Sequence, residues 1–238
     1  MAPRIFWQAF CPATLFLVLF QFAVYLGVYE SRQSLAGLNP LNIRTLINYQ
    51  ALLVSGLSFT LPEAASLLIR GKSGVGKTTL LRAVAGLWPY VAGKVARPLD
   101  EQALFLPQKP YLPLGSLRQA LYYPASAEPG ARAEEVLRQC HLAHLVSQLD
   151  VEGDWARILS LGEQQRLAIG RVLLNRPQVV FLDEASSAMD EGLEYAMYHL
   201  LRQALPDAIL VSVGHRDSLG DYHGRRLDWI APALWRFA

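Results

Sequence analysis

Apolar residues are concentrated near the start of this chain. No charged residue occurs between Ile5 and Tyr29, and Leu15–Phe20 carries no polar side chain. A run of about 20 apolar residues is long enough to cross a bilayer as a helix. A secretory signal is disfavoured because the run is too long and no small-x-small cleavage site follows it. A buried core helix would normally carry some polar positions, so the pattern predicts a transmembrane segment within residues 1–32.

The pattern then changes to that of an α/β domain. Residues 33–50 are mixed and polar, with helix breakers such as Pro40, and indicate a connector. From residue 51 to about 230, short apolar runs alternate with helix-like stretches. The predicted strands are Leu57–Leu61, Ser66–Arg70, Gln178–Glu184 and Ala208–Val213. The predicted helices are Leu80–Leu87, Arg132–Leu149 and a stretch that begins after Ser160 and runs through Leu174.

A glycine-rich loop directly follows the strand Ser66–Arg70. It has the G-x-x-x-x-G-K-[ST] pattern between a strand and a helix, which disfavours an ordinary turn. Glycines let backbone N–H groups surround phosphate oxygens, and the next helix points its positive end at the same anion. Lys77 would contact the β- and γ-phosphates, and the Thr78 hydroxyl would ligate Mg²⁺. The predicted nucleotide-binding residues are Gly71, Ser73, Gly74, Gly76, Lys77, Thr78 and Thr79.

Two carboxylates end the apolar strand Gln178–Glu184. Ligands of parallel α/β sheets bind beyond the carboxyl ends of the strands, so both acids are expected to face the nucleotide. Asp183 is predicted to hold Mg²⁺, directly or through water. Glu184 is predicted to polarise the attacking water as a general base. A solvated acidic strand end is the alternative, and the phosphate loop upstream makes it the weaker one.

Charge and cysteine content narrow the functional classes. The chain has 22 basic and 20 acidic residues and a formal net charge of +2. This balance excludes a strongly basic nucleic-acid binder, and no nucleic acid partner is expected. Two cysteines are too few for a disulfide scaffold or a zinc ribbon.

Several motifs together resemble the ATP-binding cassette of ABC proteins. Ser160 and Glu163 have capping-box spacing, which by itself indicates only a well-capped helix. The surrounding Leu159–Gln164 resembles the family's signature motif, with Leu161 and Glu163 departing from its commonest form. The other landmarks follow in family order: Gln108 as the Q-loop glutamine, Ser187–Asp190 as the D-loop and His215 as the switch histidine. The resemblance covers roughly residues 52–227.

The resemblance implies a fold and a set of roles. The fold is a P-loop NTPase core sheet with a helical subdomain at about 113–176, a reduced antiparallel β subdomain and one N-terminal transmembrane helix. Gln108 would sense the γ-phosphate and help to hold Mg²⁺, and His215 would orient the γ-phosphate and water. The residues expected to reach ATP across a head-to-tail homodimer or heterodimer are Ser160, Gly162, Glu163 and Asp190.

The segments Phe105–Arg118 and Asp154–Trp155 narrow the resemblance to half-transporters that fuse a membrane domain to a cassette. This branch includes peroxisomal fatty-acyl transporters and bacterial cobalamin and antimicrobial-peptide transporter relatives. The implied function is ATP hydrolysis that powers transport, with ATP and Mg²⁺ bound and the cassette on the cytoplasmic side of an inner or plasma membrane. Membrane lipid, contacted through the N-terminal helix, and a separate transmembrane subunit are further expected partners.

Two alternatives remain beside this reading. The membrane domain looks shortened to one helix, so the chain could be a truncated, non-transporting remnant that still binds ATP. One helix per chain is not expected to enclose a transport path without another membrane subunit. A soluble ABC ATPase of the DNA-repair or translation type is disfavoured by the apolar run Ile5–Tyr29.

Overall fold

The computed structural model describes residues 54, 56–88, 95, 96, 98 and 102–238. The predicted transmembrane segment and connector, residues 1–50, lie outside the described residues. Within the part of the chain that is described, no helix is both long and apolar enough to cross a membrane.

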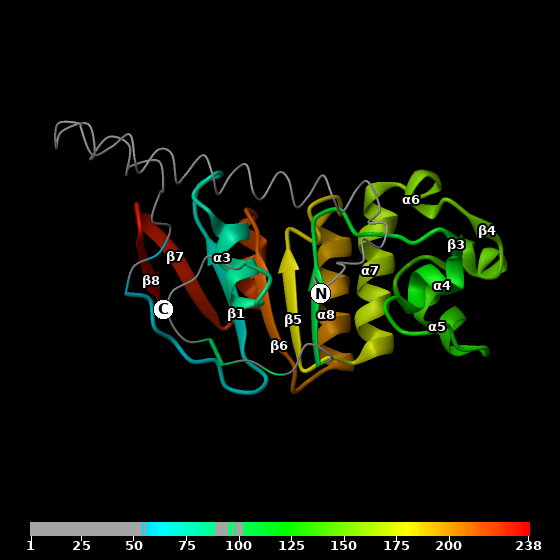
Figure 1. The fold of residues 1–238 in the computed structure, drawn as a ribbon, viewed down its shortest axis with the longest axis horizontal. Coiled ribbons are helices and arrows are strands. Elements are labelled where there is room, and N and C mark those ends of the chain that lie inside the picture. Colours follow the sequence, from blue (N-terminus) through cyan, green and yellow to red (C-terminus); the bar gives the residue numbers. More distant parts are fainter. Residues whose placement is uncertain (1–53, 55, 89–94, 97, 99–101) are drawn as a thin grey trace, which may run out of the picture. The chain divides into compact units, whose positions relative to one another are not determined.

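A six-stranded sheet forms the centre of the described region (Figure 1). Its strands are β1 (Ser66–Arg70), β2 (Ala103–Leu106), β5 (Val179–Asp183), β6 (Ile209–Val213), β7 (Arg225–Ala231) and β8 (Leu234–Phe237). They lie in the order β2-β5-β6-β1-β7-β8, and all neighbours are parallel except β7 and β8. The carboxyl ends of β1, β2, β5 and β6 therefore meet at one edge. The predicted α/β class is confirmed, with a mixed sheet.

The predicted strand at Leu57–Leu61 is wrong, because this segment has no strand pairing in the structure. Its apolar side chains nevertheless pack against the core. Phe59 stacks on Phe237 of β8, with ring centroids 5.2 Å apart. An alternating apolar pattern predicts which side chains are buried. A β-strand also needs hydrogen bonds to the backbone of a neighbouring strand, which the pattern does not predict. Among the described residues, the main sheet has one antiparallel pair, β7 with β8, and both strands come after β1, β2, β5 and β6 in the chain.

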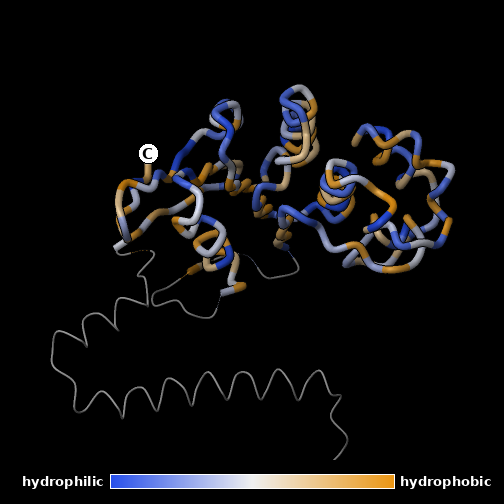
Figure 2. Tube along the Cα trace, turned by 90° about the horizontal axis from the view of Figure 1, so that it is seen from above, coloured by the Kyte–Doolittle hydropathy of each residue, from blue (hydrophilic) through white to orange (hydrophobic). Residues whose placement is uncertain are grey.

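Helices cover both faces of the sheet, seen from above in Figure 2. α3 (Lys77–Val84) packs on one face in a core that contains Leu67 and Ile69 of β1. α7 (Leu161–Asn175) and α8 (Glu191–Ala204) pack in the core that contains Leu68. Successive side chains of β1 therefore point into two different cores. A buried parallel strand of this kind is apolar on both faces, which explains why the predicted bounds of β1 are correct.

A helical region follows β2 and lies at one end of the sheet (Figure 1). Its elements are the two-stranded pair β3 (Gly115–Ser116) and β4 (Glu152–Gly153), and the helices α4 (Leu117–Tyr122), α5 (Arg132–Gln139), η3 (Ala143–Gln148) and α6 (Trp155–Ile158), with α7. Trp155 anchors this region, since it is 1% exposed and its indole N–H donates to Gly115 O over 3.2 Å. The last small helix, η4 (Asp217–Tyr222), follows β6.

Two predicted helices end earlier than expected, for one reason. The stretch Arg132–Leu149 is broken after Gln139, where His141 has φ 56°. The His141 N–H then bonds to Arg138 O, and the Leu142 N–H bonds to Leu137 O. This is the helix-ending Schellman pattern, here with histidine in the position that glycine usually takes. α3 ends in the same way at Gly86, whose φ is 75°, instead of continuing to Leu87.

Candidate functional site

The glycine-rich loop lies between β1 and α3, as predicted. Gly74 (φ 79°) and Gly76 (φ 95°) take left-handed conformations that other residues rarely adopt, and Gly76 is the N-cap of α3. Ser73 is exposed in the loop, and Thr79 lies in the first turn of α3. The loop therefore turns its backbone at the positive end of a helix, the arrangement that favours anions.

Lys77 is held under the loop by the loop's own carbonyl groups. Its Nζ donates to Gly71 O and Lys72 O, each at 3.0 Å, and the residue is 5% exposed. Burial lowers the pKa of Lys77, while the nearby carboxylates of Glu184 and Asp183 act in the opposite direction. The ammonium group is thus positioned at the loop before any ligand binds, which reduces the ordering needed on binding.

The hydroxyl of Thr78 and the carboxylate of Asp183 meet at the end of β5. Thr78 Oγ1 donates to Asp183 Oδ1 over 2.7 Å. Asp183 is 5% exposed, and burial raises its pKa although the Thr78 hydrogen bond lowers it. Carboxylate and hydroxyl oxygens are the donors that Mg²⁺ prefers, so these two residues fit a magnesium ion.

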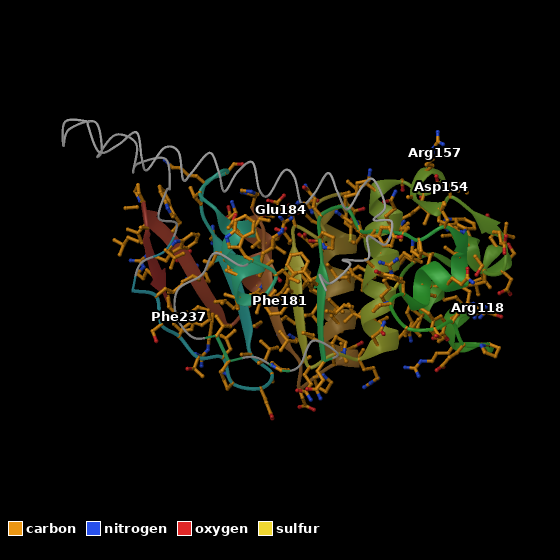
Figure 3. All side chains as sticks on the ribbon, viewed as in Figure 1. Arg118, Asp154, Arg157, Phe181, Glu184 and Phe237 are labelled. Atoms are coloured by element: carbon orange, nitrogen blue, oxygen red, sulfur yellow. The ribbon has the colours of Figure 1, made fainter. Side chains whose placement is uncertain are left out.

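Glu184 contacts both other predicted catalytic residues. Gln108, two residues beyond β2, lies with its Nε2 3.2 Å from Glu184 Oε2. His215, two residues beyond β6, lies with its Nε2 3.0 Å from Glu184 Oε1. Figure 3 shows Glu184 at the end of β5, beyond Phe181. Among the described residues, Gln108 thus contacts Glu184 rather than the Thr78–Asp183 pair.

The backbone of Glu184 is strained. Its φ is 52°, a left-handed conformation that costs a non-glycine residue about 1–3 kcal/mol. Its N–H bonds to Val213 O over 3.0 Å, so the next strand holds the residue in place. The carboxylate of this strained residue is the one that contacts Gln108 and His215.

The predicted signature residues form the capped start of α7. Ser160 is the N-cap, and its N–H donates to Glu163 Oε2 over 2.9 Å in a complete capping box. His144 of η3 lies with its Nε2 2.9 Å from Glu163 Oε1. Burial acts to raise the pKa of Glu163, but hydrogen bonds from Ser160 and His144 hold it below its ordinary value. These bonds fix the helix start within the chain itself.

Gly162 brings this helix start against the turn that follows β5. A Cβ atom at Gly162 would lie 3.0 Å from Ala188 O, closer than a methyl group normally approaches. Asp190 ends the same turn and is the N-cap of α8, where its Oδ1 accepts from the Leu193 N–H over 2.8 Å. The predicted signature and D-loop residues are therefore packed together.

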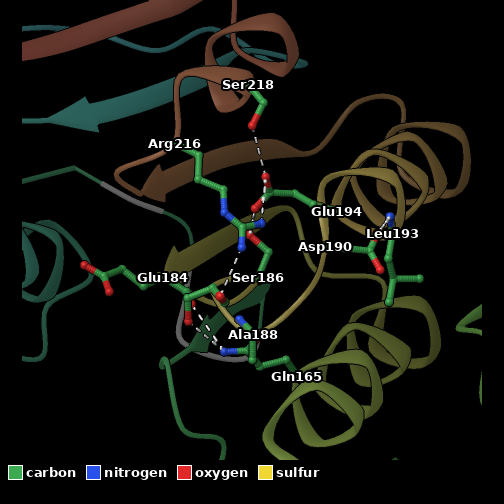
Figure 4. Close-up of polar contacts among 10 residues, drawn as sticks. Gln165, Glu184, Ser186, Ala188, Asp190, Leu193, Glu194, Arg216 and Ser218 are labelled. Atoms are coloured by element: carbon green, nitrogen blue, oxygen red, sulfur yellow. Dashed lines mark hydrogen bonds and ion pairs between the residues drawn. The ribbon is translucent and has the colours of Figure 1, made fainter.

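Sequence reasoning missed Gln165, which joins these parts. It is 0% exposed, and its Nε2 lies 2.8 Å from Gln108 O and 3.1 Å from Ser187 Oγ. Its Oε1 accepts from the Ala188 N–H over 3.0 Å (Figure 4). Helical spacing could have revealed it, because Gln165 lies four residues before the buried Ile169 on an otherwise apolar face.

Comparisons with known proteins agree with this geometry. The family profile described as ABC transporter matches residues 54–187. A Haemophilus influenzae ABC transporter ATP-binding protein is 54% identical over 186 residues, covering 77% of this chain and 31% of the relative. The human lysosomal cobalamin transporter ABCD4 is 37% identical, covering 77% and 32%. The chloroplastic ABC transporter D family member 2 of Arabidopsis thaliana is 36% identical, covering 74% and 32%.

A solved structure shares the fold. A bacterial Atm1-family ABC exporter with ATP bound aligns with a TM-score of 0.67 at 23% identity, covering 76% of this chain and 34% of that one. The chain spans roughly a third of the length of the curated relatives it matches. None of these comparisons favours the truncated, non-transporting alternative. The motif resemblance is confirmed, and this chain belongs to the ABC transporter family through its ATP-binding domain.

Proposed function

We propose that the chain binds and hydrolyses ATP as the cassette of an ABC transporter. The observation that carries this proposal is the contact of Glu184 with both Gln108 and His215, beside a loop shaped for phosphate. Two side chains, from the segments that follow β2 and β6, converge on the carboxylate of Glu184, which follows the strand β5 between them. A structural role alone would not require that convergence at the open end of a parallel sheet.

ATP would bind with its phosphates on the glycine-rich loop. The backbone N–H groups of Gly71–Gly76 and the start of α3 would surround the β- and γ-phosphates, and Lys77 would supply the cation. Thr78 and Asp183 would hold Mg²⁺, which neutralises phosphate charge when bound, and Gln108 is the third proposed ligand. The remaining loop contacts proposed are Ser73, Gly74 and Thr79.

Hydrolysis would depend on the carboxylate of Glu184. As a general base it would accept a proton from water that attacks the γ-phosphorus, while the bond to the β-phosphate oxygen breaks. His215 would orient the γ-phosphate and the water. Gln108 would contact the same water and report the γ-phosphate to the helical region. The strained backbone of Glu184 supports this role, because strain is retained where geometry matters.

The active form would be a head-to-tail dimer of cassettes. Ser160, Gly162 and Glu163 lie at the start of α7, and Asp190 lies at the start of α8. These four residues would complete the site of the second chain. The relatives named as transporters support coupling to a membrane domain, on the cytoplasmic side of a membrane. That domain would be a lipid-contacting segment of the same protein or a separate transmembrane subunit.

Phosphate release by the purified protein tests the proposal. The parent protein should release phosphate from ATP in a Mg²⁺-dependent reaction, and Glu184→Gln should bind ATP but release little. Equal release with and without Mg²⁺, or equal release by the variant, would contradict the assignment.

A further inference from the structure

A second polar cluster joins the turn that follows β5 to the segment that follows β6, the two segments that carry Glu184 and His215 (Figure 4). Its centre is Glu194, in the first turn of α8, which is only 1% exposed. The hydroxyls of Ser186 and Ser218 donate to its two carboxylate oxygens. Ser186 belongs to the turn after β5 and Ser218 to the segment after β6. One buried carboxylate therefore binds the two segments that carry the proposed catalytic residues.

Arg216 makes a second connection between the same segments. Its Nη1 lies 3.4 Å from Glu194 Oε2, and its Nη2 donates to Ser187 O over 3.2 Å. Arg216 directly follows His215. Ser187 closes the turn that begins at Glu184, since its N–H bonds to Glu184 O over 3.1 Å. The guanidinium group of Arg216 thus connects the segment that carries His215 to the turn that begins at Glu184.

The chemistry of this cluster requires a fixed geometry. A buried carboxylate that loses its cation is left uncompensated, which is strongly destabilising. The planar guanidinium of Arg216 faces two acceptors at once, with Nη2 hydrogen-bonded to Ser187 O and Nη1 ion-paired with Glu194 without a hydrogen bond, and a lysine ammonium cannot reproduce that fork. The start of α8 adds a favourable field for Glu194. The cluster therefore connects the turn that carries Glu184 to the segment that carries His215 through a partly buried ion pair and three hydrogen bonds.

We propose that Arg216 and Glu194 are positioning residues that hold His215 against Glu184. Glu194 is the buried anchor, and Arg216 transmits the position of the 184–190 turn to the histidine. A movement of that turn, which also carries Ala188 and Asp190, would then change the distance between His215 and Glu184. The proposal deepens the ATPase assignment and rests on it.

Turnover measurements separate positioning from stability. Arg216→Gln and Glu194→Gln should each lower kcat about tenfold or more and leave KM and the Kd for ATP nearly unchanged. Arg216→Lys should not restore kcat, because it keeps the charge and loses the fork. Arg202→Gln is the matched control. Arg202 also donates to two backbone carbonyls, Ala208 O at 2.9 Å and Ala65 O at 3.2 Å, at the far side of β6. It should lower Tm without changing kcat of the folded protein.

The decisive comparison uses a His215→Ala background. If Arg216 acts through His215, then Arg216→Gln should reduce the residual turnover of the His215→Ala protein by less than twofold. The same reduction in both backgrounds would overturn the proposal, as would a fall in Tm without a fall in kcat. Glu194→Gln, which conserves shape, covers the case in which Arg216→Gln does not fold.

NMR of the His215 ring does not depend on ATP hydrolysis, so it tests the positioning role separately from the proposed ATPase function. The ring signals of His215 in an NMR spectrum should shift in Arg216→Gln as they do in Glu184→Gln, since both changes remove the Glu184 contact. His215→Gln assigns these signals among the five histidines of the chain. Unshifted signals overturn the positioning role even if the parent hydrolyses ATP. Shifted signals in a protein without ATPase activity would support it and contradict the proposed function.

Discussion

The hydroxyl of Thr78 donates a 2.7 Å hydrogen bond to a carboxylate oxygen of Asp183, although 105 positions separate the two residues. The bond joins the start of α3 to the end of β5. Because Glu184 directly follows Asp183, the same bond fixes the proposed base relative to the phosphate loop. The residues proposed for ATP binding and for hydrolysis are therefore held together by the same hydrogen bond. Because they are different side chains, substitutions can affect binding and hydrolysis separately.

Lys77→Ala should weaken ATP binding. Its ammonium group is already placed at the loop, and a hydrogen bond to a charged group contributes about 1.5–3 kcal/mol, so the Kd should rise about 10- to 100-fold. Isothermal titration calorimetry measures this. Lys72→Ala is the control, because the Lys72 side chain is exposed and its backbone carbonyl is retained. An unchanged Kd for Lys77→Ala would reject the phosphate loop.

Glu184→Gln should lower kcat by about 10²- to 10⁴-fold and leave the Kd for ATP within a fewfold. A general base acts in the transition state, so its loss spares ground-state contacts. Single-turnover phosphate release and equilibrium binding check the two quantities. Glu191→Gln, an exposed carboxylate in the first turn of α8, is the control. If Glu184→Gln turned over like the parent, another base would have to exist.

Much of the fold could be predicted because buried parallel strands have a strong local signal. Ser66–Arg70 is apolar on both faces, and its predicted bounds match β1. The helix ends and the strand at Leu57–Leu61 could not be predicted as easily. Whether a segment pairs depends on a distant backbone, and a histidine such as His141 at a left-handed helix end has no distinctive sequence pattern.

The residues of the candidate site could be predicted where one motif holds them within a few residues, or where separate motifs follow the order of a known family, as for Gln108 and His215. The loop around Lys77 is a motif of the first kind. Gln165, Glu194 and Arg216 act through contacts with residues far away in the chain, and each is an ordinary polar helix or loop residue in sequence. In the structure, burial reveals Gln165 (0% exposed) and Glu194 (1% exposed), whereas the contacts of Arg216 with Glu194 and Ser187 reveal Arg216. That burial is a property of the packed fold.

Gly162→Ala should lower ATP turnover even though the change adds one methyl group. The new Cβ would lie 3.0 Å from Ala188 O, so α7 and the D-loop would have to separate by a few tenths of an ångström. Gly220→Ala is the matched control, because a Cβ there meets nothing within 4 Å. A steady-state assay should show at least a fewfold loss of kcat for Gly162→Ala only. Equal activities would show that this close approach has no role in turnover.

Stability should fall in mild acid because of His223. The ring is buried, with Nε2 2.8 Å from Ser212 Oγ and Nδ1 2.7 Å from Leu219 O, and burial lowers its pKa to about 4. Between about pH 6.5 and 4 the unfolded chain binds a proton that the folded chain does not, so the free energy of unfolding decreases as pH falls.

Urea unfolding at pH 7 and pH 5 measures this loss. The contribution of His223 to the decrease should be about 2 kcal/mol at about 1.36 kcal/mol per pKa unit. The decrease should be smaller by that amount in His223→Gln and unchanged in His199→Gln, whose ring is exposed. An equal decrease in all three proteins would show that His223 is not buried in its neutral form.

Two inactive variants should restore activity when they are mixed. In the proposed head-to-tail dimer, each site combines the phosphate loop of one chain with the Ser160 helix start of the other. Lys77→Ala destroys the loop half and Ser160→Ala the signature half, so a mixed dimer keeps one site with both halves intact. Random mixing makes half of the dimers mixed, so the mixture should regain up to about a quarter of the parental turnover. Turnover per chain should also rise with protein concentration, since association is required. A mixture no more active than its components, from chains that do exchange, would mean that each chain builds its site alone.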